Sequence, residues 1–164
     1  MKLSILLISI LYLALNVDLA EVRNDYRIAV NSKTKAFELN TKLENITKSD
    51  EKVLVAYKGA VTSITAQYLG SNKLKSTTFK NGISLIEYAV DNDSNNIEIR
   101  FVRLSVQQNS PRFLKYNKEI ETDKKFIIDN FHQIKSPEFK IYLKGYILDS
   151  ENFTDDEKNV ILST

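Results

Sequence analysis

Apolar side chains recur every three or four positions through most of the chain after residue 20, which is the spacing of one face of an α-helix. The clearest example is the segment 50–69, where one apolar stripe predicts a long amphipathic helix. The stripe consists of Val53, Tyr57, Ala60, Val61, Ile64 and Tyr68. Ser49 or Asp50 is expected to cap the start of this helix, and Gly70 stands where a left-handed residue commonly follows the end.

A second stripe of the same spacing predicts a helix over 76–91, with Ser76 as its N-cap. Gly59 lies inside the first predicted helix, where glycine costs about 1 kcal/mol relative to alanine. Because the neighbouring Ala56 and Ala60 are also small, we expect Gly59 to permit the close approach of another helix.

A run of polar residues at 91–96 predicts the turn that follows this second helix. Asn95 or Asn96 is expected to cap the helix that comes next. Glu98 would then lie in the first turn of that helix, where the helix dipole favours an acidic side chain.

The segment 97–108 is apolar on more than one face, so its periodicity is ambiguous. Two sets of apolar residues alternate as in a strand, and the alternation changes register between them. The sets are Ile97, Ile99 and Phe101, and Val102, Leu104 and Val106. A flat strand would put the two sets on opposite faces, whereas a helix accommodates both. We therefore predict a largely buried helix.

The remaining helix signals are an apolar stripe at 118–134, a serine–proline helix start at 136–137 and a capping box at 154–157. Pro111 opens a short turn, and one or two helices are expected within 22–46. Few glycines and prolines argue against β-hairpins, and the Asn-Gly pair at 81–82 lies inside the apolar stripe of the predicted helix 76–91. The sequence thus predicts an all-α protein in which antiparallel helical hairpins form a small bundle or a right-handed superhelix, with 21–164 as a single domain.

Residues 1–20 have the pattern of a signal peptide. Lys2 precedes an apolar run from Leu3 to Leu15, which is shorter than the roughly 20 residues that a membrane span needs. Ala20 is the expected last residue before cleavage, and an uncleaved anchor helix is the alternative. We expect an exported protein, periplasmic or extracellular, that meets a membrane only through this segment.

The composition excludes several chemistries. The 164 residues contain no Cys and one His, and their formal net charge is +2. The lack of Cys excludes disulfides, thiolate metal sites and a cysteine nucleophile. His132 is expected to be a surface residue near a helix C-terminus, where the dipole favours a cation. A net charge near zero and the absence of phosphate-loop or metal motifs predict no nucleic-acid partner, no metal and no cofactor.

The best candidate for a charged binding site is a cluster on and near the predicted helix 97–108. It consists of Glu98, Arg100, Arg103 and Asp123. An unpaired buried guanidinium is costly, so these arginines need partners. One interpretation is a site for a small anion or a peptide carboxylate, and the other is an internal salt bridge that holds helices in register. Tyr57 is a further binding candidate, because tyrosines suit binding surfaces and helix packing alike.

Two patterns resemble helical-repeat proteins. The stretch 82–96 resembles the second helix and exit turn of a tetratricopeptide repeat, through Gly82, Ile86, Ala89, Val90, Asp93, Ser94 and Asn96. A wider pattern over 22–135 resembles a group of small exported bacterial α-helical proteins with repeat-like hairpins. It includes Tyr57-Lys58-Gly59-Ala60, Phe79, Glu98-Ile99-Arg100-Phe101 and Pro111. The resemblance implies a tetratricopeptide-like superhelix in an extracytoplasmic bacterial setting, and it transfers no catalytic residue.

Capped amphipathic helices without a catalytic motif favour binding over catalysis. We therefore predict a non-catalytic interaction module that recognises a protein partner on the surface of its helical hairpins. One alternative is an enzyme with an arginine and carboxylate site that no motif reveals. The other is a carrier of a small apolar ligand in the helical core. Perturbed acids in a deep pocket near Arg100 or Arg103 would favour the enzyme, and a large apolar cavity would favour the carrier.

Overall fold

The computed structural model describes residues 17–164, and all regular structure in this part of the chain is helical. Its α-helices are α1 (Leu19–Ala29), α2 (Lys33–Lys42), α3 (Lys52–Ala66), α4 (Asn72–Asn92), α5 (Ile97–Asn109), α6 (Ile120–Asn130), α7 (Pro137–Asp149) and α8 (Asp155–Leu162). Two short 3₁₀ helices are η1 (Arg112–Leu114) and η2 (Phe131–Gln133). The prediction of an all-α fold is confirmed.

The predicted signal peptide lies almost wholly outside the described residues, which begin at Val17. The helix α1 starts at Leu19, and the side chain of Asp18 caps it by accepting a 2.9 Å hydrogen bond from the backbone N–H of Ala20. Cleavage after Ala20 would therefore remove this cap and the first two helical residues. No helix between 17 and 164 is long and apolar enough to cross a membrane.

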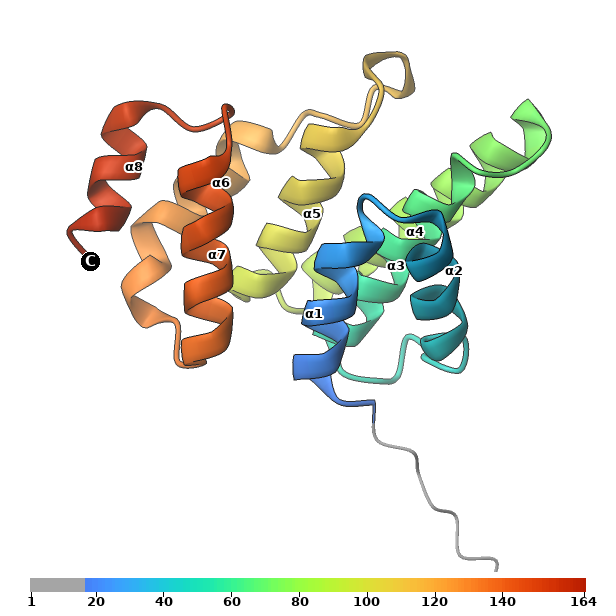
Figure 1. Ribbon diagram of the computed structural model, residues 1–164, viewed down its shortest axis with the longest axis horizontal. Coiled ribbons are helices and arrows are strands. Elements are labelled where there is room, and N and C mark those ends of the chain that lie inside the picture. The colour runs from blue at the N-terminus through green and yellow to red at the C-terminus, as the bar shows by residue number, and fades with distance from the viewer. Residues whose placement is uncertain (1–16) are drawn as a thin grey trace, which may run out of the picture.

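The helices pack as successive hairpins, with α1 against α2, α3 against α4, and α5 against α6. The helix α3 also contacts α1, α2 and α5, so it joins the first three hairpins. The helix α8 lies at one end of the long axis, and the turn between α3 and α4 lies at the other (Figure 1). One cluster of buried apolar side chains extends from Val22 in α1 to Ile161 in α8.

Two glycines set the close contact between α3 and α4. A Cβ atom added to Gly59 would lie 2.6 Å from the carbonyl oxygen of Gly82, and one added to Gly82 would lie 2.5 Å from the carbonyl oxygen of Gly59. Any side chain at either position would therefore push the two backbones apart. The prediction that Gly59 permits a close helix contact is confirmed, and Gly82 is its partner.

The helix predicted over 97–108 is confirmed as α5, and it is buried on several sides. Ile99, Phe101, Val102 and Leu104 are all fully buried, so both of the alternating apolar sets face protein. Asn96 is the N-cap, and its side-chain oxygen accepts hydrogen bonds from the first backbone N–H groups of the helix.

The helix starts predicted for the C-terminal part of the chain are also confirmed. Ser136 caps α7 with Pro137 in its first turn. Thr154 and Glu157 form both bonds of the capping box that begins α8. The single helix predicted over 118–134 is shorter, because α6 begins at Ile120 and gives way to η2 at Phe131.

Three predicted helix ends were wrong. The helix α3 follows Glu51, because the Asp50 carboxylate instead accepts bonds from the N–H and hydroxyl of Thr47 in the preceding turn. Gly70 is not left-handed, since no glycine in residues 17–164 has a positive φ. The helix α4 begins at Asn72, where the Ser71 cap precedes the predicted Ser76 by more than a turn.

Candidate functional site

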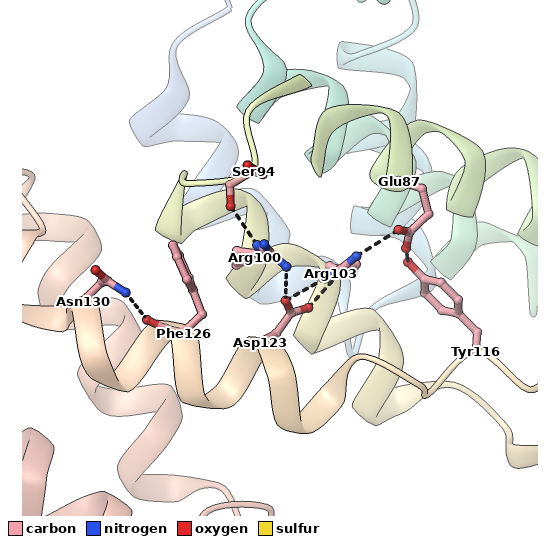
Figure 2. Close-up of polar contacts among 8 residues, drawn as sticks. All are labelled: Glu87, Ser94, Arg100, Arg103, Tyr116, Asp123, Phe126 and Asn130. Carbon is pink, nitrogen blue, oxygen red and sulfur yellow. Dashed lines mark hydrogen bonds and ion pairs between the residues drawn. The ribbon is translucent and has the colours of Figure 1, made fainter. Parts of the chain in front are cut away.

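The predicted arginine cluster forms around one buried carboxylate in the interface between α5 and α6. Asp123 is fully buried. Its two oxygens accept bonds from Arg103 Nε at 2.7 Å and Arg103 Nη2 at 2.8 Å, in a bidentate pair. Arg100 Nη1 donates to the same carboxylate at 2.9 Å, so Asp123 lies between the two guanidinium groups (Figure 2).

The outer side of this cluster is closed by a second acid. Arg103 Nη1 donates to Glu87 of α4 at 2.9 Å, and the other oxygen of Glu87 accepts from the Tyr116 hydroxyl at 2.5 Å (Figure 2). Arg100 Nε donates to the backbone oxygen of Ser94 at 2.9 Å. We call Glu87, Arg100, Arg103, Tyr116 and Asp123 the α5–α6 ion cluster, in which two positive charges balance two negative ones.

Burial and pairing act in opposite directions on the pKa of Arg103 and in the same direction on the pKa of Tyr116. Burial by itself would lower the pKa of Arg103, but the hydrogen bonds and charges of Asp123 and Glu87 outweigh it and raise that pKa above its ordinary value. Burial raises the pKa of the Tyr116 phenol, and the bond to Glu87 raises it further. Both side chains therefore stay protonated as hydrogen-bond donors.

Glu98 does not join that cluster. It is buried, and its two oxygens accept bonds from Nε and Nη2 of Arg23 in α1, both at 2.7 Å. The Tyr57 hydroxyl of α3 donates to the same carboxylate at 2.8 Å. Burial, and next the charge of Glu98, hold the pKa of Tyr57 well above its ordinary value. This second network joins α1, α3 and α5, and we call it the Glu98 cluster.

The four predicted site residues therefore divide between two networks on different sides of α5. The expected pairing of the two arginines with Asp123 is present, whereas the grouping of Glu98 with them is wrong. Glu98 precedes Arg103 by five positions, and at 100° per residue the two side chains leave the helix in different directions. Sequence reasoning missed Arg23 and Glu87, because each meets its partner only through tertiary packing.

The geometry of both networks favours the internal salt-bridge interpretation. Every nitrogen of the Arg103 guanidinium donates to a carboxylate of this chain. Removing one partner from such a buried pair leaves an uncompensated charge, which is typically costly. An external anion would have to displace Asp123 or Glu87 before it reached this guanidinium.

A concave site lies elsewhere, at the end of the bundle where α1, α3 and α5 end and α4 begins. The C-terminal ends of α1 and α5 both point upward in Figure 1. The cleft has a volume of about 800 Å³ and is open to solvent. None of Tyr57, Glu98, Arg100 and Arg103 lines it. We call this feature the end cleft.

The floor of the end cleft is formed by apolar side chains and by hydroxyl groups that already form hydrogen bonds within the chain. Phe79 and Val106 are buried there. The Ser63 hydroxyl donates to the backbone oxygen of Gly59, and the Ser105 hydroxyl donates to that of Val102. The Tyr26 hydroxyl lies 2.8 Å from Ser105 Oγ and donates to it. Burial raises the pKa of Tyr26 to about 12, against a smaller lowering by Ser105.

The rim of the end cleft is polar and contains one charged side chain. Carboxamide side chains from four segments surround the opening: Asn31, Gln67, Asn72 and Asn109. Lys75 of α4 is the charged residue of the lining, which contains neither a carboxylate nor an imidazole. Phe113 of η1 also lines the opening, and 80% of its surface is exposed. The next residue but one, Lys115, has a left-handed backbone with φ of 54°.

Phe113 lies in a turn that the sequence did indicate, since Pro111 predicted a short turn at this point. No sequence pattern indicated the cleft, because the residues that line it come from five separate segments of the chain. His132, the single histidine, is exposed at η2 and lies outside the cleft. In residues 17–164 no group of three acidic or histidine side chains is arranged to hold a metal ion.

Comparisons of the chain with protein-family models, with curated proteins and with solved structures find no match. The resemblance to exported bacterial proteins with tetratricopeptide-like hairpins therefore stays a prediction. The residues of the end cleft and of the two ion clusters are therefore the observations that bear on function.

Proposed function

We propose that this protein is an exported, non-catalytic binding protein that holds an extended segment of another protein in the end cleft. The observation that supports this most is the cleft itself, which combines about 800 Å³ of open volume with an apolar floor and a polar rim. A concave site of this kind, largely apolar with a few placed polar groups, is typical of ligand recognition.

The stacking of the hairpins supports the proposal. The helices α1, α3 and α5 contact one another in order, and each is followed by its hairpin partner. We propose that this is a tetratricopeptide-like superhelix, in which neighbouring hairpins build a binding surface that none of them forms alone. The end cleft draws its lining from all three hairpins.

Binding fits the end cleft better than catalysis does. A general acid or base has to lie within hydrogen-bond reach of a substrate, and the cleft lining offers neither a carboxylate nor an imidazole for that role. The acids that do approach arginine are bound within the two ion clusters and lie outside the cleft.

A small apolar ligand is the second candidate, because a volume of about 800 Å³ is within the range of small-molecule pockets. The cleft is open at the end of the bundle, however, and is not enclosed in its core. A hydrocarbon there would stay partly in water and would leave the rim carboxamides without partners. A protein segment suits the same surface better.

The test is selection of linear peptides from a random phage-displayed library on the purified protein, followed by NMR titration of the isotopically labelled protein with the selected sequences. We expect chemical-shift changes at the backbone amides of Ile64, Ser76, Val106 and Leu114. Shifts confined to other surfaces, or a cleft that responds only to a small apolar probe such as a dansylated alkyl amide, would contradict the proposal.

Export is tested separately. We expect protein released by the producing cell to begin at Glu21, which N-terminal sequencing measures directly. Intact chains that remain in the membrane fraction would favour an uncleaved anchor instead.

A further inference from the structure

Lys75 is a half-buried cation with no carboxylate of its own. It lies on the face of α4 that lines the end cleft, and it forms no ion pair with any acid in residues 17–164. Two buried cations differ from it, since Arg103 and Lys124 both contact acids, and the half-buried Lys58 donates instead to the backbone oxygens of Glu44 and Ile46. In the free protein water solvates the Lys75 ammonium, and a ligand that filled the cleft would remove part of that water.

A ligand without a negative charge would remove water from Lys75 and could offer the ammonium group only a neutral oxygen, which is a weaker acceptor than a carboxylate. A carboxylate placed against the ammonium group would compensate that loss with a charge-assisted hydrogen bond. Because the cleft lining holds no acid, the carboxylate has to come from the ligand.

The rim favours a peptide as the source of this carboxylate. The side chains of Asn31, Gln67 and Asn72 form no hydrogen bond with any residue in 17–164, and Asn109 uses only its N–H₂ group, which donates to the backbone oxygen of Ser105. Each carboxamide can donate and accept at once, which is the pattern that a peptide group presents. A hydrocarbon tail would leave all of them unmatched.

The floor supplies the apolar part of the recognition. Phe79 and Val106 are buried, Ile64 and Leu114 are half-buried, and the ring of Phe113 stands exposed at the opening. In an extended peptide alternate side chains point to the same side. One set can enter the floor while the peptide groups between them meet the rim.

We infer that the end cleft selects an extended apolar peptide that carries one carboxylate, and that Lys75 is the residue that recognises this charge. This inference rests on the proposed function and names its ligand class. The carboxylate can be an Asp or Glu side chain or the free C-terminus of the partner, and the experiment separates these sources.

The probes are synthetic peptides of about six residues, which span about 20 Å when extended. Leucine and serine alternate, both ends are blocked, and an aspartate is moved through every position. Matched sets carry asparagine or lysine at the same positions, and one further asparagine peptide has a free C-terminal carboxylate. NMR titration gives both the dissociation constant and the place of binding.

We expect at least one aspartate peptide, or the peptide with the free C-terminus, to bind the cleft about tenfold more tightly than its neutral counterpart, as one charge-assisted bond implies. The lysine set should bind most weakly. Lys75→Gln should remove the preference, and Lys75→Arg should retain it. Lys73→Gln is the matched control, because Lys73 lies on the same helix but is exposed and outside the cleft.

If neither the aspartate set nor the peptide with the free C-terminus bound more tightly than the blocked asparagine set, the inference would be overturned and the proposed function would stand. The same would follow if Lys75→Gln, shown by its NMR spectrum to be folded, kept the preference for the acid. If no peptide of any charge perturbs the cleft, the proposed function fails and the inference fails with it.

Discussion

The two ion clusters and the end cleft use polar side chains in opposite ways. Around α5, every charged group is matched within the chain: Arg103 contacts Asp123 and Glu87, and Glu98 contacts Arg23 and Tyr57. At the end cleft, Lys75 and three rim carboxamides have no partner among residues 17–164.

This difference distinguishes polar groups that stabilise the fold from polar groups that remain able to bind a ligand. A buried polar group that is fully satisfied gives specificity to the fold and is costly to disturb. An accessible polar group beside apolar surface costs the fold little, and it can still form its bonds with a ligand. The predicted site residues Tyr57, Glu98, Arg100 and Arg103 are of the first kind, although their residue types were compatible with either.

The largest effect is expected from Asp123→Asn, which breaks the α5–α6 ion cluster. Two guanidinium groups would keep their burial and lose their carboxylate, so we expect the free energy of unfolding to fall by about 3–5 kcal/mol. Urea denaturation followed by circular dichroism measures this. Asp129→Asn on the same helix is the control: this exposed acid pairs with Lys125 on the surface of α6, and the substitution should change stability by less than about 0.5 kcal/mol. Equally small losses in both variants would contradict the role assigned to the cluster.

The close contact between α3 and α4, two helices that line the end cleft, is tested by Gly82→Ala. The added methyl group would collide with the Gly59 backbone, so we expect a loss of about 3 kcal/mol from overpacking in the same denaturation experiment. Gly145→Ala is the matched control: nothing lies within 4 Å of its added Cβ, and alanine favours the helix interior by about 0.5–1 kcal/mol. A stable Gly82→Ala variant would mean that α3 and α4 do not need this close contact.

Phe113→Ser should change binding without changing the fold. Because the ring is 80% exposed, we expect the free energy of unfolding to stay within about 0.5 kcal/mol. Affinity for a peptide bound in the end cleft should fall about tenfold through lost apolar contact. NMR titration measures the affinity, and Ile141→Ser, at a similarly exposed apolar position on α7, should leave it unchanged. Unaltered peptide affinity in Phe113→Ser would remove η1 from the site.

The smallest effect is expected from Glu157→Gln in α8. Burial alone would raise the pKa of Glu157, but the Thr154 backbone N–H and the Lys124 charge lower it below its ordinary value of 4.5. A carboxylate with a lowered folded pKa stabilises the protein above its unfolded pKa, and that contribution disappears as the pH falls through the folded pKa. We expect the variant to lose about 1 kcal/mol near neutral pH.

Measurements at two pH values test whether the charge of Glu157 causes this loss of stability. The stability difference between wild type and Glu157→Gln should shrink when unfolding is repeated near pH 3, where the carboxyl is increasingly protonated. Asp156→Asn lies outside the pair with Lys124 and is the matched control. A difference that stays constant with pH would show that the Glu157 charge contributes nothing.

Much of the helical structure followed from short-range patterns. The Asn96 cap, the Ser136-Pro137 start and the Thr154 capping box are local, because each joins groups within three residues of one another. The helix start that was predicted wrongly for α4 also depends on local sequence. Ser71 and Ser76 are equally able caps, and the apolar stripe did not show that α4 begins more than a turn earlier.

The spacing of apolar and small residues along the chain is enough to specify its amphipathic helices, the buried face of each helix and the close helix contact at Gly59. Which helix covers each buried face depends on how the helices pack together. Glu98 therefore meets Arg23, 75 positions away, and the end cleft forms from the ends of helices that are distant in the chain. A linear pattern shows that a charge needs a partner, but the partner is chosen by how the helices pack.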